Sequence, residues 1–350
     1  MSARPVHQQR WLALAAATQI GAIGAATQAN AQAPTNCPTM RPMKIGVSVS
    51  PPNVIHTVPY VAKALGIFAK RCIDASIIQF DGGAAGTAIT AVAQGTSINN
   101  LTAAAVAQGI RAKQIWGMAP RPPQSYVVSE SVKDFADLKG KRLSAAGGIG
   151  GYNWLMGREV LKKGGLKVED AIFISQGTAG RLPGLLTGQL DGVVLHPEDV
   201  FIAQQKKPGT HVLIPLKELL PMVTFNSYGA STDWIARDRA LLRDVVASMI
   251  EADRAIYREK EKVIPVMMQA TEKPRDAVEF AYDFLTKNCL WAVNTGFNKD
   301  RINWTLDNDV ANGDIEAAKK PTFEQVVDLS LANEALEAAG GETTINGCKD

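Results

Sequence analysis

Short hydrophobic runs alternate with longer amphipathic stretches over the first two thirds of the chain. The short runs predict strands: KIGVSV (44–49), ASIIQF (75–80), INNLTA (98–103), KQIWGMA (113–119), KRLSAAG (141–147), AIFISQ (171–176) and DGVVLH (191–196). The longer stretches predict helices at 58–71, 84–95 and 153–165, and a loop with a helix at 177–189. Strands that alternate with helices form crossover units, so the pattern predicts an α/β fold with mostly parallel sheets.

The proline-rich segment APRPPQS (119–125) separates two sets of these units. Proline has a fixed φ and no N–H, so we expect a stiff connection there rather than a helix or strand. The order strand, glycine, helix, strand occurs around 79–98 and again around 174–194, which is consistent with two lobes of similar topology. From about Thr232 onward, apolar residues recur at helical spacing and predict long amphipathic helices.

Residues 1–33 predict a secretory signal peptide that is cleaved. Arg4 and Arg10 precede an apolar stretch over 11–26, and the small-x-small cleavage pattern lies at 31–33. The alternative is an N-terminal membrane anchor, but polar residues and a glycine interrupt the stretch before the roughly 20 apolar residues that a span needs. No cysteine follows the cleavage site directly, so we expect no lipid anchor and a periplasmic mature chain.

The charge balance gives no reason to expect nucleic acid as a partner. The chain has 37 Lys and Arg against 34 Asp and Glu. Arg4 and Arg10 belong to the signal segment, which has no acidic residue, so the mature chain has 35 basic and 34 acidic residues, about +1. A near-neutral chain lacks the basic surplus that binds phosphate backbones.

The four cysteines, Cys37, Cys72, Cys289 and Cys348, predict two disulfides. They form no Cys-x-x-Cys pair and no histidine lies at ligand spacing, so we expect no metal site. Cys37 precedes the first predicted strand and Cys72 precedes the second, positions that fall at one end of a sheet. We therefore predict Cys37–Cys72 and, by elimination, Cys289–Cys348, and the alternative is four buried free thiols.

The glycine-rich stretch SAAGGIGGYNWL (144–155) lies between a predicted strand and a predicted helix, where a backbone can approach a ligand closely. It is not a dinucleotide fingerprint, because Asn153 stands at the third glycine position and the next strand ends at Gln176 instead of an acid. No phosphate-binding G-x-x-x-x-G-K-[ST] loop occurs either. We expect no cofactor.

Catalytic motifs are scarce, and we expect no catalytic residue. The chain has no G-x-S-x-G or H-E-x-x-H, and only His56, His196 and His211 follow the signal segment. His196 ends a predicted strand just before Glu198 and Asp199, so a His–Glu pair could do acid–base work there. The alternative, which we favour, is a ligand contact or a loop histidine with satisfied hydrogen bonds.

Five loops at the carboxyl ends of predicted strands are rich in small residues: SPPNVIH, DGGAA, TAAA, GGIGGYN and QGTAG. In α/β sheets, ligands bind beyond these strand ends, where helix N-termini offer free N–H groups. Any one glycine is explained equally well by a tight turn. The five loops together predict a site for a small anionic or polar ligand.

Three segments resemble a known family. In order behind the signal peptide, PYVAKALGIF (59–68), DLKGK (137–141) and GQLDG (188–192) are similar to the solute-binding proteins of ABC importers for nitrate, sulfonates, taurine and thiamine-pyrimidine precursors. The similarity runs over about 44–232. It implies a two-lobed periplasmic-binding-protein fold of type II, whose two hinge crossings let the lobes close around a ligand.

The resemblance also implies a function and a division of the chain. We expect a monomer, not an enzyme, that captures a small organic anion or heterocycle and delivers it to a membrane permease. Lobe 1 would comprise 34–125 and 228–350, the latter with the C-terminal helices, and lobe 2 would comprise 126–227. The ligand contacts implied by position are Asn53, His56, Gly83, Ala84 and Thr102 from lobe 1, and Gly150, Gly151, Tyr152, Gln176, Thr178 and His196 from lobe 2.

The chain departs from the family pattern in its charged residues. Ile98 stands where the family often has the acid of a G-x-x-D. No arginine clearly matches an oxyanion clamp. Arg181 could form one from the first turn of a helix, but we expect a solvated charge there instead. Tyr152, Trp154 and Tyr228 leave room for a stacked heterocycle or aromatic acid.

Two alternative functions remain open at this point. The family resembles an intracellular thiamine-pyrimidine synthase in which a histidine takes part, and His56 or His196 could have that role. The signal peptide argues against this enzyme, because its chemistry needs cytosolic cofactors. The other alternative is a ligand-sensing receptor subunit.

Overall fold

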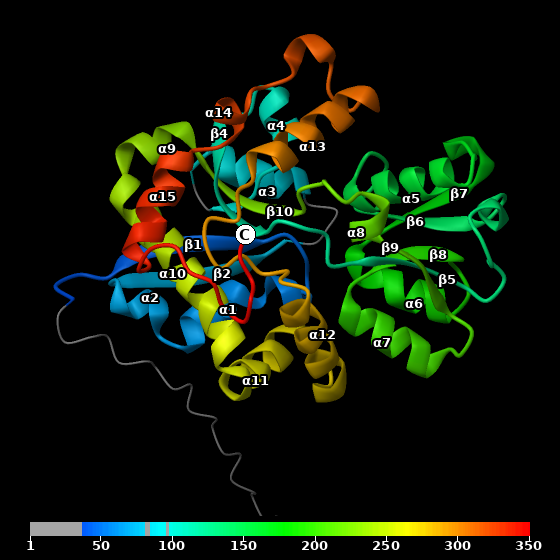
Figure 1. Cartoon of the computed structure of the whole chain (residues 1–350), viewed down its shortest axis with the longest axis horizontal. Helices are drawn as coiled ribbons and strands as arrows, with labels where there is room; N and C mark the ends of the chain where they lie inside the picture. The colour runs from blue at the N-terminus through cyan, green and yellow to red at the C-terminus, as the bar shows by residue number, and fades with distance from the viewer. Residues whose placement is uncertain (1–36, 81–84, 96–97) are drawn as a thin grey trace, which may run out of the picture. The chain divides into compact units, whose positions relative to one another are not determined.

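The computed structural model describes residues 37–80, 85–95 and 98–350. The predicted signal peptide and two of the predicted ligand contacts, Gly83 and Ala84, lie outside these residues. Two groups of strands, one blue to cyan and the other green, form the centres of two lobes (Figure 1). No helix in the described part of the chain is long and apolar enough to cross a membrane.

The sheet of lobe 1 has the strand order β2-β1-β3-β10-β4. Its strands are β1 (Arg41–Val47), β2 (Ile73–Gln79), β3 (Asn99–Asn100), β4 (Ala112–Ala119) and β10 (Asn226–Ser231). β1 pairs in parallel with β2, and a parallel bridge between Ile45 and Ile98 joins β1 to the start of β3. β10 lies between β3 and β4 and runs antiparallel to both.

The sheet of lobe 2 has the order β7-β6-β8-β5-β9. Its strands are β5 (Ser125–Val128), β6 (Arg142–Ala146), β7 (Ile172–Gln176), β8 (Gly192–Leu195) and β9 (His211–Pro215). β6 is parallel to β7 and β8, whereas β5 is antiparallel to β8 and β9. Both sheets therefore have the same order, with one antiparallel strand that directly follows a crossing between the lobes.

Helices cover both sheets. Those of the first segment are α1 (Val58–Ala64), α2 (Ile67–Lys70), α3 (Ala85–Ala93) and α4 (Ala103–Ala107). Those of lobe 2 are α5 (Tyr152–Lys163), α6 (Arg181–Leu186), α7 (Pro197–Lys206) and α8 (Leu216–Leu219). The return segment contributes α9 (Thr232–Arg237), α10 (Arg239–Arg258), α11 (Lys260–Thr271), α12 (Arg275–Lys287), α13 (Lys299–Ala311), α14 (Phe323–Val326) and α15 (Leu329–Ala338).

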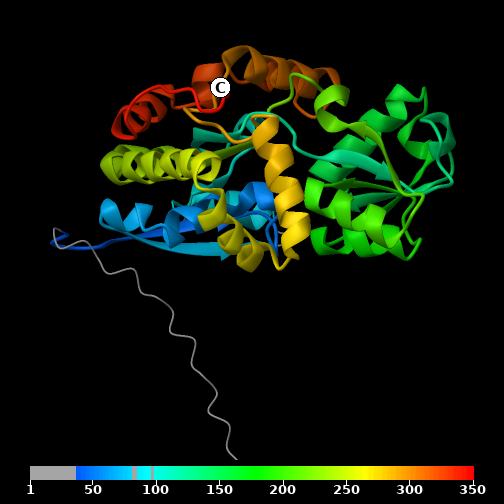
Figure 2. The ribbon, with the colours of Figure 1, turned by 60° about the horizontal axis from the view of Figure 1, so that its bottom comes forward.

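The long helix α10 organises the core of lobe 1. Its apolar face, which includes Leu242, Val246 and Met249, is fully buried against α1 and α15. The gold helix α12 lies beside lobe 2 (Figure 2), where the Phe280 ring is 5.1 Å from the Phe201 ring of α7. The return segment therefore completes lobe 1 and also contacts lobe 2.

Two predicted elements differ in the structure, and two strands were not predicted. The strand predicted over 98–103 is short, because Thr102 caps α4 by accepting a hydrogen bond from Ala105 N. The helix predicted over 58–71 divides into α1 and α2 at Gly66, which has a φ of +68°. We did not predict β9 or β10. β10 has the polar sequence NSYGAS and becomes a strand only because two neighbouring strands pair with it.

Both predicted disulfides are present. Cys37 pairs with Cys72 and Cys289 pairs with Cys348, with Cα–Cα distances of 5.5 and 5.3 Å. These are all the cysteines of the chain, so the alternative of free thiols is excluded. The second disulfide attaches the last residues of the chain to the end of α12.

Replacing Cys37 and Cys72 together by alanine should destabilise the mature protein. The disulfide closes a loop of 35 residues, and losing that restraint on the unfolded chain costs about 3–4 kcal/mol. Urea unfolding of the oxidised protein and of the double variant measures this difference. A midpoint that does not change would contradict the predicted contribution of the disulfide.

Candidate ligand-binding site

A cavity of about 620 Å³ lies between the two lobes. It begins where strands end, because Ser48 follows β1, Gly147 follows β6 and His196 follows β8. The carboxyl ends of the parallel strands of both lobes thus meet at one space, where α/β proteins bind ligands. Its volume is in the usual range for small-molecule sites. Residues 302–314, in and after α13, close a further side.

The structure places most of the predicted contacts at this cavity. Its lining includes His56, Thr102, Gly150, Gly151, Tyr152, Thr178 and His196. Asn53 and Gln176 are not part of the lining. Asn53 Nδ2 donates instead to Glu198 Oε1 of α7, and Gln176 Nε2 donates to Ser144 Oγ over 3.4 Å. Gly150 has a φ of +81° in the turn that leads into α5, a conformation that favours glycine.

An aromatic cluster of His56, Tyr152, His196 and Phe225 forms one wall. The rings of His56 and His196 have centroids 5.4 Å apart, and Phe225 lies 6.0 Å from His56 and 5.7 Å from Tyr152. His56 comes from lobe 1, Tyr152 and His196 come from lobe 2, and Phe225 lies in the return crossing. The wall therefore forms only when both lobes contribute to it.

Both histidines of the cluster are neutral at neutral pH. Burial, helped by the positive charge of Arg181, lowers the pKa of His56 to about 3. Burial also lowers the pKa of His196 well below its usual value, as do His56, Arg181 and Lys273. An imidazolium is disfavoured where water cannot solvate it and no carboxylate contacts it.

A short hydrogen-bond chain orients His196. Tyr152 OH donates to Gln124 Oε1 over 3.3 Å, which turns the amide nitrogen of Gln124 toward His196 Nε2, 3.2 Å away. Nε2 then accepts, so the hydrogen of the neutral ring is on Nδ1. Nδ1 of His196 is buried and has no hydrogen-bond partner among the residues that the structure describes.

Arg181, the first residue of α6, is buried and lines the cavity, so the expectation of a solvated charge there is wrong. Its guanidinium donates to Thr178 O (2.9 Å), Val194 O (3.1 Å) and Asn53 Oδ1 (3.4 Å). Asp199 and Glu198 favour its charged form against the cost of burial. The strand that precedes α7 and the loop that precedes α6 therefore hold this arginine in place.

Two buried carboxylates in the first turn of α7 connect the lobes. Glu198 Oε1 accepts from Asn53 Nδ2 (2.7 Å) and from Val54 N (3.0 Å), both of lobe 1. Asp199 accepts from Asn53 Nδ2 (3.2 Å) and pairs with Lys273, which lies between α11 and α12. We call this set of contacts the inter-lobe network. Burial and the neighbouring Asp199 raise the pKa of Glu198 to about 7.

A second contact between lobe 2 and the return segment lies at the α13 side of the cavity. Arg158 of α5 forms two hydrogen bonds with Asp314, of 2.9 and 2.8 Å, and a third with Glu159. Asp309 lines the cavity nearby, and burial together with Asp314 raises its pKa to about 7.

Sequence reasoning did not identify the α13 residues, Gln114, Gln124 or Phe225 as part of the site. Ile302, Thr305 and Asp309 recur at helical spacing, which is a signal for one face of a helix. That spacing does not tell which partner the face meets. Gln114 and Gln124 lie within and just before strands, where nothing in the local pattern distinguishes them from other polar positions.

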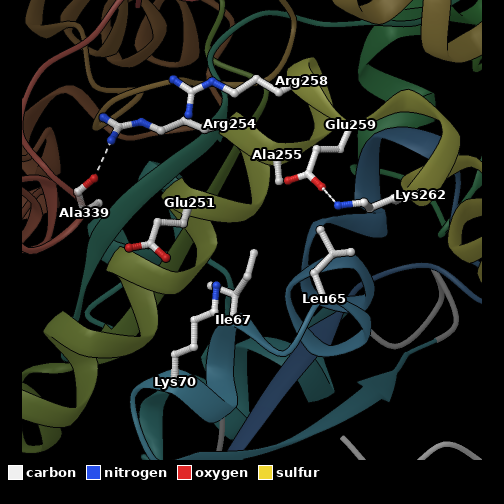
Figure 3. Close-up of a pocket in the computed structure, with 10 residues that line it drawn as sticks. All are labelled: Leu65, Ile67, Lys70, Glu251, Arg254, Ala255, Arg258, Glu259, Lys262 and Ala339. Carbon is white, nitrogen blue, oxygen red and sulfur yellow. Dashed lines mark hydrogen bonds and ion pairs between the residues drawn. The ribbon is translucent and has the colours of Figure 1, made fainter.

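A smaller cavity of about 410 Å³ lies among α2, α10 and α11 (Figure 3). Four of its six charged side chains have partners within the protein, among them Glu251, which pairs with Arg71. Arg254 donates to Val293 O, Ala339 O and Gly341 O, and Glu259 pairs with Lys262. These contacts fix the C-terminal segment against α10, so this cavity has a structural explanation and the larger one is the candidate site.

Comparisons with known proteins agree with this architecture. A family model described as NMT1/THI5 like matches residues 53–262. The aliphatic sulphonate binding protein SsuA from Escherichia coli is similar in structure, with 19% identity, a TM-score of 0.63 and coverage of 82% of this chain and 91% of that chain. The nitrate-binding protein NrtA from Synechocystis PCC 6803 has 13% identity, a TM-score of 0.67 and coverage of 87% and 90%.

An enzyme shares the fold as well. The desulfurization enzyme DszB has 14% identity and a TM-score of 0.59, with coverage of 85% of this chain and 99% of that chain. Comparison with curated protein sequences gives no match. At these identities the structural likenesses show the fold, and they confirm the two-lobed α/β architecture that the sequence predicts.

The variant Glu198→Gln should gain stability relative to the wild type as the pH rises. The folded-state pKa of about 7 lies above that of an exposed glutamate, so the stability contributed by Glu198 is present below about pH 4.5 and is lost as the pH rises through 7. The quantity to compare is the thermal midpoint of Glu198→Gln minus that of the wild type. This difference should be roughly 3–6 °C larger at pH 8 than at pH 5. Glu218→Gln, at an exposed position of α8, is the control. A difference that does not vary with pH would contradict the prediction.

Proposed function

This chain belongs to the NMT1/THI5-like family, and from that premise we propose that it is the solute-binding subunit of an ABC importer. It would capture a small solute in the periplasm and deliver it to a membrane permease. The ligand would bind in the cavity between the lobes, which close around it by hinge motion at the two crossings.

The observation that carries this proposal is the cavity between the lobes, whose lining side chains include buried polar atoms without a partner. They are His56 Nδ1, Gln114 Oε1, Asn153 Oδ1, His196 Nδ1, Thr224 Oγ1 and Ser227 Oγ, and none has a hydrogen-bond partner among residues 37–80, 85–95 and 98–350. Leaving such a group unsatisfied costs about 1–3 kcal/mol. A polar ligand that satisfies several of them at once would gain this free energy on binding.

The contacts between the lobes support closure around the ligand. Asn53 of lobe 1 reaches Glu198 of lobe 2, and Arg158 reaches Asp314 on the opposite side of the cavity. These polar pairs can separate and form again as the lobes move. They therefore suit an interface that opens to admit a ligand.

Three observations support an extracytoplasmic, transport-related role. The N-terminal pattern is that of a signal peptide, and both cysteine pairs are oxidised to disulfides, which persist in oxidising compartments. The related folds include a sulphonate-binding and a nitrate-binding protein described as periplasmic.

We propose a monomer with no nucleic-acid partner. Its lobe 1 comprises 34–125 and 228–350, and its lobe 2 comprises 126–227.

We propose that the protein binds its ligand without chemical conversion, although one relative by fold is an enzyme. The alternative enzyme would use a histidine, and a general base works best with a pKa near the operating pH, whereas the pKa of His56 is about 3. All four cysteines are in disulfides, so none is available as a thiolate nucleophile. Conversion of a bound ligand by the purified protein, followed by mass spectrometry, would overturn this part of the proposal.

Thermal unfolding of the mature protein against a panel of solutes tests the function. The panel contains nitrate, alkanesulfonates, aromatic carboxylates, thiamine pyrimidines and flavins. A ligand at 1,000 times its Kd should stabilise the protein by about 4 kcal/mol, and the same ligand should bind with one-to-one stoichiometry in calorimetry. If no member stabilises protein that has first been partly unfolded and dialysed to remove bound ligand, the proposal fails.

Replacing His196 by alanine should weaken binding of any ligand that the panel identifies. The variant loses the buried Nδ1 donor and one ring of the aromatic cluster, so Kd should rise at least about tenfold. His211→Ala is the matched control, because His211 begins β9 and does not line the cavity, and its Kd should stay within about twofold. Equal effects of the two substitutions would show that His196 does not contact the ligand.

A further inference from the structure

The segment between α12 and α13, residues 288–298, has no regular secondary structure and is nevertheless largely buried. Leu290, Trp291, Ala292 and Val293 are at most 1% exposed. A connecting segment normally lies on the surface, because its backbone N–H and C=O groups need water where no strand or helix pairs them. The partners of this α12–α13 segment therefore come from other parts of the protein.

The first crossing between the lobes, residues 119–125, is attached to the α12–α13 segment by a side chain. Arg121 donates to Asn288 O over 2.7 Å and to Cys289 O over 3.1 Å. From lobe 2, Lys217 of α8 donates to Asn288 Oδ1 over 2.8 Å. The start of the segment is therefore bonded both to the crossing and to lobe 2.

Backbone contacts attach the strand that precedes this crossing. Gly117 N of β4 donates to Thr295 O over 2.9 Å, and Ala292 N donates to Met118 O over 3.0 Å. A Cβ on Gly117 would lie 2.5 Å from Gly296 O, so this close approach requires glycine. Because β4 leads directly into the crossing, the segment fixes the point from which the crossing starts.

The return crossing, residues 220–225, is bonded to the first turn of α13. Asn298, the last residue of the α12–α13 segment, caps this helix by accepting from Arg301 N over 3.0 Å. Arg301 in turn donates to Pro221 O over 2.7 Å. The two crossings therefore have a common support.

Residues 339–350 hold the α12–α13 segment in place. Cys289, near its start, is joined to Cys348 by a disulfide. The carboxylate of Asp350 accepts from three backbone N–H groups of the segment: Val293 N (2.8 Å), Asn294 N (3.1 Å) and Gly296 N (2.6 Å). Backbone N–H groups that converge in this way bind an anionic group well, so Asp350 supplies partners that the irregular backbone would otherwise lack.

The segment is also bonded to the candidate site. Trp291 Nε1 donates to Ile55 O over 3.0 Å, and Ile55 directly precedes His56, which lines the cavity. Tyr257 OH of α10 donates to Trp291 O over 3.0 Å and fixes the indole from the other side. One segment thus contacts both crossings and the loop that carries His56.

We propose that the α12–α13 segment is a hinge brace: locked by Asp350 and the Cys289–Cys348 disulfide, it restrains the bending of both crossings. This inference rests on the proposed solute-binding function only for its consequence. A looser hinge populates more open states, and the apparent affinity for a ligand falls with the fraction of protein that is in the binding-competent state. The restraint itself acts in ligand-free protein.

Amide hydrogen exchange of the ligand-free mature protein, followed by mass spectrometry, tests the brace. Asp350→Ala removes the acceptor of three N–H groups of the brace. Exchange should rise at least about tenfold in peptides that span 115–125 and 219–226, while β6 and β8 keep their rates. Lys349→Ala is the matched control, since Lys349 is exposed and pairs with the exposed Glu342. It should leave all rates unchanged.

The two disulfides give a second comparison. Cys289→Ala with Cys348→Ala removes the other lock of the brace, whereas Cys37→Ala with Cys72→Ala removes a disulfide of the first segment of lobe 1. At a temperature where both double variants are folded, only the first should raise exchange at the two crossings at least about tenfold. Only the first should increase the radius of gyration in small-angle X-ray scattering, because freed lobes separate further.

The outcomes distinguish the brace from the proposed function. Faster exchange that is confined to 288–298 and 339–350, with both crossings unchanged, overturns the brace and leaves the solute-binding function standing. An equal rise over the whole of lobe 1 also overturns it, because a merely structural role would have that effect. If the crossings loosen but no solute of the panel stabilises the protein, the proposed function fails and the brace stands.

Discussion

The inter-lobe network is the constraint on which the rest of the site depends. In this network Lys273 pairs with Asp199 beside Glu198, and the positive charge of Arg181 lies next to it through the contact with Asn53, in a region from which water is largely excluded. Buried charges are tolerated when they compensate one another and are hydrogen-bonded, as Glu198 Oε1 is, whereas Glu198 Oε2 has no partner among the described residues. Asn53 completes this arrangement from lobe 1, because its amide donates to both carboxylates and its oxygen accepts from Arg181. The facing surfaces of the two lobes are therefore defined by charge pairing.

This network also determines the character of the cavity. The positive charge of Arg181 helps to keep both histidines neutral, so they act as hydrogen-bonding aromatic rings instead of cations. Asp199 and Glu198 in turn compensate the positive charge of Arg181, so the cavity has no excess of positive charge from this residue. An arginine in a cleft is often interpreted as an oxyanion clamp. Here its protein partners account for much of its hydrogen-bonding capacity.

The common strand order of the two sheets brings the site together. In each lobe the strand after a crossing, β5 or β10, inserts antiparallel next to the parallel strands. The crossings are thereby anchored within both sheets, and the loops at the carboxyl strand ends of the two lobes face a single cavity. Residues far apart in sequence, such as His56 and Phe225, become neighbours for this reason.

The sequence by itself determined the features that depend on local patterns: the strands β1, β2, β6, β7 and β8, the glycine turn before α5 and both disulfides. Hydrophobic periodicity, turn chemistry and chain connectivity act over short distances, so a single sequence displays them. The tertiary structure alone decided that Asn53 joins the lobes, that Arg181 is buried and that Asp309 lines the cavity. Those outcomes depend on contacts between segments that are more than 100 residues apart in the sequence. No local pattern encodes the partner of a polar side chain.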